Sequence, residues 1–395
     1  MTLPSAVEQE IRDLIEQNGR ITFARFMEAC LYSPNGGFYA TRGSRINAHF
    51  GTSPTSHPAF GDLIARQLEQ MWRLLGEPAV FHVIEVGSGD GAMARSIVDA
   101  CRRTAPRFAE ALYYVGADYE PGWVHSSAQH LELPDPSGDG MASSGRNPVR
   151  AVQRVRAEGL RSFRNIVGCI LCNELIDNFP VHRFAIADGS VKEIFVGTEG
   201  GQFVEVLSEP SSPRIAERLA ALGPSLPEGY RGEVNLAMED WIGQVGGALG
   251  RGFVLTIDYG ELAEDLYSSE NSQGTLVCFN RHAISGDPYQ DVGQQDITSQ
   301  VDFTALMRLG ERPGLETAGY TLQREFLANL GFHEFLDAPG TPGISAARAE
   351  LNRIAMLTLV DPEEYGNFKV LAQARGMGSG VELRGFRTEK SDPTA

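Results

Sequence analysis

Basic residues are scarce in this chain. It carries 34 Lys and Arg against 51 Asp and Glu, which gives a formal net charge of −17 at pH 7. A protein that binds the backbone of a nucleic acid needs clustered Lys and Arg, so we expect no nucleic-acid partner. The same charge leaves a basic protein segment or a small molecule open as the partner.

Cysteines are also few, and they are scattered. Their number, five, is odd, which argues against a disulfide framework and fits a reducing compartment. Cys169 and Cys172 form a CxxC pair, but they lie within the apolar run Ile166–Cys172. No second CxxC or nearby His completes a zinc site. We therefore interpret the pair as buried strand residues and expect no bound metal.

Long hydrophobic runs are absent. No stretch is long and apolar enough to span a bilayer, and residues 1–20 carry acids where a signal peptide would have a basic start and an apolar core. We expect a cytoplasmic protein with no membrane partner. The sequence leaves the oligomeric state open, a homodimer included.

The order of expected elements indicates an α/β fold. Apolar spacing predicts two helices within residues 5–31 and another after Thr52-Ser-Pro54. Further along, the patterns predict strands at 80–86, 112–117, 152–156, 166–172 and 252–257, helices at 92–103, from 122 and within 233–250, and a strand pair within 184–197. Strands that alternate with helices form a mostly parallel, doubly wound sheet covered on both faces. The fold expected is therefore Rossmann-like.

A glycine-rich loop follows the first of these strands, in Val83-Ile-Glu-Val-Gly-Ser-Gly-Asp-Gly91. The spacing of Gly87, Gly89 and Ala92 satisfies a relaxed dinucleotide fingerprint. Three features favour S-adenosylmethionine instead of NAD. Glu85 lies on the strand where dehydrogenases usually have an apolar residue, and the tight GxGxG loop suits a cofactor without a pyrophosphate. Asp118, which ends the next strand, is placed to accept the hydroxyls of a ribose.

An acidic strand end, a GxGxG loop and a second acid resemble the adenosylmethionine site of class I methyltransferases. The cofactor-binding residues that we predict from the loop and the neighbouring strand ends are Glu85, Gly87, Ser88, Gly89, Gly91, Asp118, Tyr119, Glu158 and Asn173. Glu158 is expected against the adenine. Asn173 is placed to hydrogen-bond either the cofactor or the methyl acceptor.

Candidate catalytic residues follow the strand at 166–172. If a helix begins there, Glu174 and Asp177 lie one turn apart on the same side. They then either hold the acceptor or stabilise the first turn of that helix. His182 is a candidate general base for an oxygen acceptor, with a structural hydrogen bond as its alternative role. Asp258 and Tyr259, at another strand end, are candidates for the acceptor pocket, although the tyrosine could equally pack in the core.

Longer strings carry a more specific resemblance. They are Tyr32-Ser-Pro-Asn-Gly-Gly-Phe-Tyr39, Thr52-Ser-Pro54, Phe60-Gly61, Cys172-Asn-Glu-Leu-Ile-Asp-Asn-Phe-Pro-Val-His-Arg-Phe184, Ile257-Asp-Tyr-Gly260, Gly274-Thr-Leu276, Gly293-Gln-Gln-Asp-Ile-Thr298 and Val301-Asp-Phe303. From about residue 20 to about residue 335, the chain resembles the MidA-like family of class I methyltransferases. Mitochondrial members of that family assist respiratory complex I assembly by methylating an arginine of a core subunit.

The resemblance implies that Tyr39 and Ser53 fold over the cofactor as a lid. It also implies four parts: an N-terminal helical lid segment (1–75), an adenosylmethionine-binding core (76–260), a substrate-side region (261–375) and a tail (376–395). Within the core we expect a mobile loop at 133–150 and an insertion at about 184–250, and we expect the tail to bury little and to be partly disordered. The chain departs from the family pattern at Thr55, where the family usually has a glutamate, which leaves a different acceptor open.

The function expected is methyl transfer from S-adenosylmethionine to a protein arginine or to a related nitrogen or oxygen nucleophile of a protein or small molecule. A guanidinium stays protonated at neutral pH, and a pair of carboxylates would hold it through a bidentate contact. Two alternatives remain: a catalytically silent adenosylmethionine-binding assembly factor or scaffold, and an NAD-dependent oxidoreductase.

Overall fold

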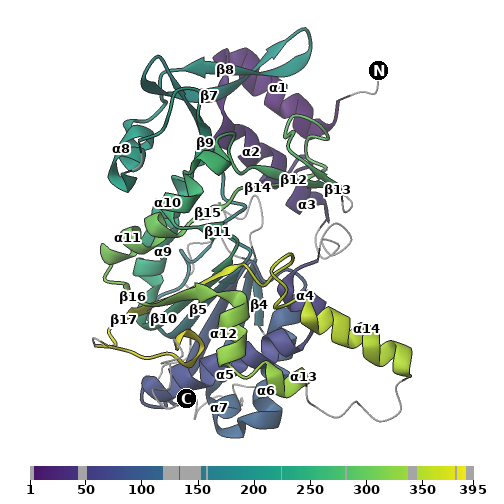
Figure 1. Ribbon diagram of the computed structural model, residues 1–395, viewed down its shortest axis with the longest axis vertical. Coiled ribbons are helices and arrows are strands. Elements are labelled where there is room, and N and C mark those ends of the chain that lie inside the picture. Colours follow the sequence, from purple (N-terminus) through teal and green to yellow (C-terminus); the bar gives the residue numbers. More distant parts are fainter. Residues whose placement is uncertain are drawn as a thin grey trace, which may run out of the picture.

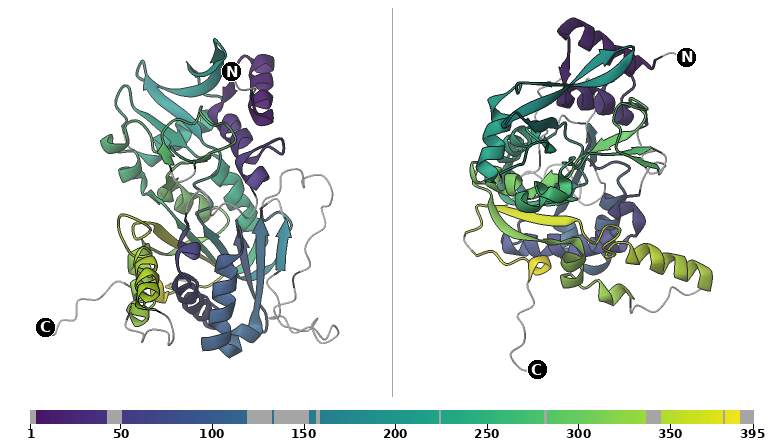
Figure 2. Two further views of the ribbon diagram at one scale, coloured as in Figure 1. Left: turned by 90° about the vertical axis from the view of Figure 1, so that its right-hand side faces the viewer. Right: turned by 45° about the horizontal axis from the view of Figure 1, so that its top comes forward.

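The chain forms a lower lobe around a large sheet and an upper lobe of helices and antiparallel strands (Figures 1 and 2). The computed structural model describes residues 4–42, 51–118, 133, 153–156, 159–223, 225–280, 283–336, 345–378 and 380–387. No helix among these residues is both long and apolar enough to cross a membrane.

The lower lobe is built on a seven-stranded sheet in the order β16-β17-β10-β5-β2-β3-β4. Its strands are β2 (Phe81–Val86), β3 (Leu112–Asp118), β4 (Gln153–Arg156), β5 (Ile166–Asn173), β10 (Leu249–Asp258), β16 (Glu316–Leu322) and β17 (Lys369–Arg375). The five strands from β4 to β10 run parallel, and β17 runs antiparallel to both β10 and β16. The predicted α/β fold with a mostly parallel sheet is confirmed.

Helices cover both faces of this sheet. One face carries α4 (Ser53–Ser56), α5 (Ala59–Leu74), α6 (Ala92–Thr104), α7 (Pro106–Ala111), α12 (Gln323–Asn329), α13 (His333–Leu336) and α14 (Ala346–Leu357), and the other carries α9 (Ala237–Ala248) and α11 (Phe303–Glu311). Alternate residues of each strand enter opposite cores, since successive side chains of a strand point to opposite faces. Cys169 is buried in one core and Cys172 in the other. The CxxC thiols are therefore separated by the sheet, as expected for strand residues.

The upper lobe contains three small sheets. The largest joins β1 (Ile21–Thr22), β6 (His182–Ala187), β7 (Ser190–Glu199), β8 (Gln202–Ser208) and β9 (Arg231–Val234); the others join β12 (Val277–Asn280), β13 (Ala283–Ser285) and β14 (Asp296–Thr298), and β11 (Gly260–Glu261) and β15 (Val301–Asp302). Around them lie α1 (Ala6–Asn18), α2 (Phe23–Tyr32), α3 (Phe38–Arg42), α8 (Pro213–Leu222), α10 (Ala263–Leu266) and the 3-10 helix η4 (Ser269–Asn271). The chain enters this lobe three times, which brings distant segments together over the sheet.

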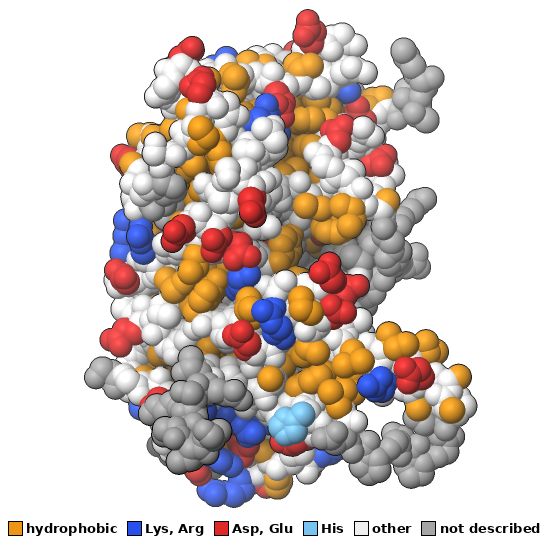
Figure 3. Space-filling model, in the orientation of Figure 1, with side chains coloured by type: hydrophobic (Ala, Val, Ile, Leu, Met, Phe, Trp, Pro, Cys, Tyr) orange, Lys and Arg blue, Asp and Glu red, His pale blue; other side chains and the backbone are white. Residues whose placement is uncertain are grey.

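Helix α14 projects from the lower lobe (Figure 1). Leu351 and Ile354, one turn apart on it, are 60 % and 51 % exposed. Figure 3 shows hydrophobic side chains gathered in this region of the face, whereas elsewhere they are interspersed with charged ones.

Two expected helices differ in the structure. No helix begins after β5: residues 174–180 form a turn, and Glu174 has the positive φ of 49°, which an α-helix does not contain. The helix expected within 233–250 is shorter, because Glu233 and Val234 belong to β9 and Leu249 begins β10. At that end, Leu249 and Arg251 pair with β5, so the chain has already joined the sheet.

The expectation that the chain buries little beyond residue 376 is wrong for residues 380–387. Leu383 is 2 % exposed, and the ring of Phe386, in the 3-10 helix η5 (Arg384–Phe386), lies 5.2 Å from the ring of Phe326. Apart from Leu133, the loop expected at 133–150 lies outside the described residues, as do residues 388–395. The division into four parts remains a prediction.

Candidate active site

A cavity of about 1620 Å³ lies at the carboxyl ends of β2, β3 and β5, between the two lobes. The strand order reverses between β2 and β5, and ligands of open α/β sheets bind at such switch points. The cavity is larger than the ~300–1,000 Å³ of typical small-molecule sites. Its described lining includes many acids and no Lys, Arg or His. The cavity therefore suits a cationic ligand and has room for two molecules.

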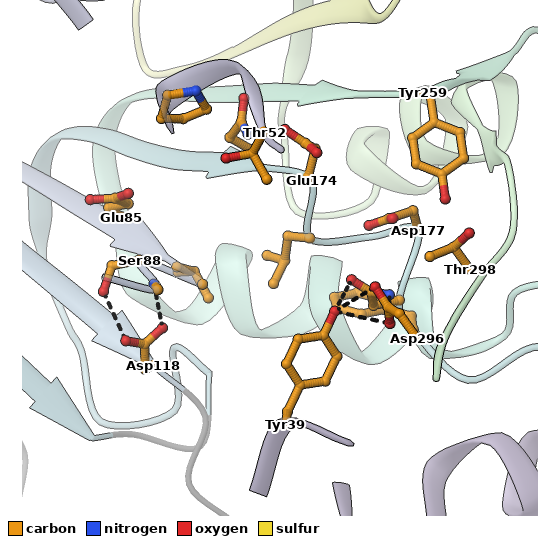
Figure 4. A pocket seen from close by; sticks show the side chains of 18 of the residues that line it. Tyr39, Thr52, Glu85, Ser88, Asp118, Glu174, Asp177, Tyr259, Asp296 and Thr298 are labelled. Atoms are coloured by element: carbon orange, nitrogen blue, oxygen red, sulfur yellow. Dashed lines mark hydrogen bonds between the residues drawn. The ribbon is translucent and has the colours of Figure 1, made fainter. Parts of the chain in front are cut away.

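The glycine-rich loop forms one end of the cavity (Figure 4). Gly87, Gly89 and Gly91 have φ angles of 77°, 53° and 76°, in the left-handed region that favours glycine. Asp118 holds this loop from the neighbouring strand: its Oδ1 accepts the N–H of Gly89 at 3.0 Å, and its Oδ2 accepts the hydroxyl of Ser88 at 3.1 Å. Asp118 lines the cavity beside this loop, and its contact with ribose hydroxyls remains a prediction.

Several atoms at this end fit S-adenosylmethionine. A Cβ at Gly89 would meet no atom of the described residues within 4 Å, and Gly89 lines the cavity. Oδ1 of Asn173 is buried and has no hydrogen-bond partner among the described residues. Because buried polar atoms are normally hydrogen-bonded, this oxygen is available to the amino group of a bound cofactor.

Of the other predicted cofactor residues, Glu85 is described in the cavity lining, whereas two lie outside the described residues. Glu85 lines the cavity and is buried, and its Oε2 accepts the hydroxyl of Tyr114 at 2.8 Å. Tyr119 and Glu158 lie outside the described residues. Trp241, Asp240 and Gln244 of α9 line the cavity near the loop but were not predicted. They lie in the insertion between β5 and β10, where no sequence motif marks them.

Three carboxyl groups converge at the other end of the cavity. Asp177 and Asp296 are 4 % and 2 % exposed, and Glu174 is partly exposed. Burial, followed by repulsion from Asp177, raises the pKa of Glu174 to about 8 and that of Asp296 to about 8. Burial also raises the pKa of Asp177. These groups resist ionisation as long as no cation compensates their charges.

Asp258 does not line this cavity; it supports the turn that carries two of the carboxyl groups. It is fully buried, and its Oδ2 accepts the N–H groups of Leu175, Ile176 and Asp177 at 3.2, 2.9 and 3.4 Å. These bonds replace those of the expected helix. Asp258 is thus a positioning residue, and the prediction that it contacts the acceptor is not supported by its place in the structure.

The structure gives the contacts of the two predicted lid residues, and their role as a lid over the cofactor remains a prediction. The hydroxyl of Tyr39 is 3.0 Å from both carboxylate oxygens of Asp296 and 2.9 Å from Oδ1 of Asn178. This tyrosine therefore lines the cavity beside the carboxyl side chains. Ser53 is fully buried and is not part of the lining. Its backbone N–H donates to Oε1 of Glu174 at 3.3 Å, as does Nδ2 of Asn173 at 2.8 Å.

Tyr259 lines the cavity, but His182 does not. The hydroxyl of Tyr259 points toward Asp177 and Thr298 (Figure 4), and both that hydroxyl and Oδ1 of Asp177 are buried without a hydrogen-bond partner among the described residues. In contrast, Nδ1 of His182 lies 2.7 Å from Oε1 of Glu193 within the upper sheet. The position of His182 fits its structural alternative and not the role of a base.

Sequence reasoning missed Asn178, Asp296 and Thr298, which line the part of the cavity that contains the three carboxyl side chains. Nδ2 of Asn178 donates to Oδ1 of Asp296 at 3.0 Å. The string from Gly293 to Thr298 could have indicated Asp296 and Thr298. It carried part of the family resemblance, but none of its residues was assigned to the site. Among the described residues, no cluster of His, Cys, Asp and Glu is arranged to hold a metal ion.

The sheet order, the glycine-rich loop and the acid at the end of the next strand define a class I methyltransferase that uses S-adenosylmethionine. A family model described as "Putative S-adenosyl-L-methionine-dependent methyltransferase" matches residues 63–321, and the chain belongs to this family. The NAD alternative is therefore set aside.

Known relatives agree with this class. A Drosophila melanogaster protein named protein arginine methyltransferase NDUFAF7 homolog, mitochondrial, is 26% identical over 395 residues, covering 94% of this chain and 85% of the relative. Its Bos taurus counterpart, named protein arginine methyltransferase NDUFAF7, mitochondrial, is 24% identical over 336 residues, covering 80% and 71%. A crystal structure from Burkholderia thailandensis, bound to S-adenosyl-homocysteine, is 27% identical with a TM-score of 0.77, covering 98% of this chain and 97% of the other.

Proposed function

We propose that this methyltransferase modifies the guanidinium group of an arginine in a protein. The observation that carries the proposal is the convergence of Glu174, Asp177 and Asp296 at one end of a cavity whose described lining contains no basic side chain. Buried carboxyl groups without a counter-ion are costly. A bound cation would offset that cost, and a planar guanidinium matches carboxylate oxygens in geometry.

Bound S-adenosylmethionine supplies an electrophilic methyl group on its sulfonium. Gly87 to Gly91 and Asp118 would hold the adenosine end, and Asn173 would hydrogen-bond the amino-acid end. Glu174, which follows Asn173 directly in the chain, then lies at the junction between the two halves of the cavity (Figure 4). Because the reaction is an in-line displacement, holding the acceptor in line is the main task of these residues.

Proton transfer is the second task. A guanidinium nitrogen that gains a methyl group must lose a proton, and a carboxylate beside it can accept that proton. Burial raises the pKa of Glu174 above the usual range of a glutamate, which makes its carboxylate a stronger base for this proton. The carboxylate of Glu174 therefore orients the acceptor and takes its proton, while Asp177 and Asp296 hold the remaining positive charge.

The names of the curated relatives support arginine as the acceptor. Thr55 stands where the family usually has glutamate, yet its hydroxyl accepts the N–H of Thr52 at 3.0 Å within the first turn of α4. The site retains three other carboxyl groups, so we propose that the loss of this glutamate leaves recognition of a cation intact.

The test is a labelled-methyl assay. Purified protein, tritiated S-adenosylmethionine and a protein extract are incubated, and the protein fraction is hydrolysed to amino acids. We expect label in methylated arginine with the native protein and little with Glu174→Gln. Label in another amino acid would show that this amino acid, and not arginine, is the acceptor. Cofactor binding without any label would favour the catalytically silent assembly factor.

A further inference from the structure

One wall of the cavity is a face of the small sheet β13-β12-β14, which lies beside α3 in the upper lobe (Figure 1). Val277, Phe279, Ile284, Asp296 and Thr298 line the cavity from these strands. The alternate residues Cys278 and Ile297 are buried in the core formed with α1 and α2. One face of the sheet is therefore packed against the core, and the other faces the cavity.

The pairing of these strands sets Asp296, Phe279 and Ile284 in one row. Phe279 of β12 is opposite Asp296 of β14 on one side and opposite Ile284 of β13 on the other. Exposure rises along this row, from 2 % at Asp296 through a partly buried Phe279 to 72 % at Ile284. The row thus leads from a buried carboxyl group to an apolar side chain at the mouth.

We infer that this row, Asp296-Phe279-Ile284, is a docking surface for an extended polypeptide segment that carries the acceptor arginine next to an apolar residue. The inference rests on the proposed function and extends it, because it separates an arginine within a polypeptide from free arginine. Free arginine has no apolar group to place against Phe279 and Ile284.

The dimensions fit such a segment. Neighbouring strands are spaced by ~4.8 Å, so Ile284 lies ~10 Å from Asp296 across two spacings. In an extended chain, two residues span ~7 Å. An arginine whose guanidinium lies beside Asp296 therefore brings the side chain two positions away, which points to the same side of an extended chain, over Phe279 and toward Ile284.

Charge and volume support the same occupant. The lining includes the exposed Glu363 and Glu364 and no described basic residue, which favours a positively charged segment. The cavity of about 1620 Å³ also exceeds what one small ligand fills. The volume that one small ligand leaves unfilled is available to the residues that flank the acceptor arginine.

The experiment compares two acceptors with native protein: N-acetyl-arginine methylamide, and a pool of nine-residue peptides with a central arginine and randomised flanks. We expect kcat/KM to be at least ten-fold higher for the pool. Mass spectrometry should find apolar residues enriched within two positions of the methylated arginine. Equal rates, or no enrichment, would overturn the docking surface while leaving arginine methylation in place.

The variants address the surface directly. Because Ile284 is exposed, Ile284→Ser leaves the core intact, and it should remove the enrichment and the advantage of the pool without changing the rate with the amide. Ile284→Val should retain both. Leu207→Ser is the matched control, since Leu207 is 52 % exposed on β8 and does not line the cavity. Equal loss in Ile284→Ser and Leu207→Ser would contradict the inference. Failure of the native protein to methylate arginine in either acceptor while it binds S-adenosylmethionine would overturn the proposed function itself.

Discussion

Oδ2 of Asp258 accepts the backbone N–H of Ile176 at 2.9 Å. Asp258 ends β10, and the N–H groups that donate to it belong to the turn that follows the neighbouring strand β5. This contact fixes the backbone between Glu174 and Asp177, the two carboxyl groups that we assign to the acceptor. A buried side chain outside the cavity thereby sets the geometry inside it.

Replacing Asp258 should misplace the acceptor site. In Asp258→Ala, three N–H groups lose their shared acceptor, and a displacement of about 1 Å at the reacting groups can cost ~10²-fold in rate. We expect kcat to fall by about that factor and the melting temperature to fall as well. Asp258→Asn keeps one acceptor oxygen and should recover part of both losses. Wild-type kcat in Asp258→Ala would remove Asp258 as a positioning residue.

Gly89→Val should abolish cofactor binding. The φ of 53° at Gly89 strains any β-branched residue, and its side chain would enter the space next to the loop. Calorimetry with S-adenosyl-homocysteine measures the loss. Gly200→Val is the control, since Gly200 has a similar φ of 57° and open space around it but does not line the cavity. Unchanged affinity in Gly89→Val would contradict the assignment of the loop.

Glu174→Gln should spare cofactor affinity and lower turnover by ~10²–10⁴-fold, the range typical of a lost general base. An amide retains most of the shape but can neither pair with a guanidinium nor take its proton. Glu364→Gln, at the exposed rim of the same cavity, should change turnover little. Single-turnover kinetics with saturating cofactor separates the two variants, and full activity in Glu174→Gln would exclude its proposed role.

The KM for a cationic acceptor should fall as the pH rises from 6 to 9. The pKa values of Glu174 and Asp296 are both raised, to about 8, so these groups are largely protonated at pH 6. A cation binds the ionised forms, and binding therefore releases protons; each proton released changes log KM by one unit per pH unit. Glu174→Gln should reduce this slope. A KM independent of pH would show that the acceptor is not a cation held by these groups.

His182→Gln should leave turnover and its pH dependence unchanged. Glutamine can still donate to Glu193, whose pKa is lowered by the hydrogen bond from His182 even though burial opposes it. The change therefore preserves the upper sheet while removing the imidazole. A large fall in turnover in His182→Gln would restore His182 as a candidate base.

Local patterns in the sequence identified the elements whose structure depends on nearby residues. The continuous apolar runs around Val83 and Ile170 predicted the buried strands. The apolar spacing around Ile11 and Phe60 predicted helices, because that periodicity reflects burial of one face. The glycine-rich loop, with Glu85 and Asp118 at successive strand ends, indicated the cofactor, because the geometry of the loop itself depends on a short segment.

Tertiary structure decided the acceptor end. Glu174, Asp177 and Asp296 were visible as acids, but Asp296 is more than a hundred positions from the other two and joins them only because β14 folds back over the sheet. The helix expected after β5 is absent because the carboxylate of Asp258, on another strand, satisfies the N–H groups of that turn. Local sequence determines which backbone conformations are low in free energy, whereas burial and long-range hydrogen bonds determine which side chains come into contact.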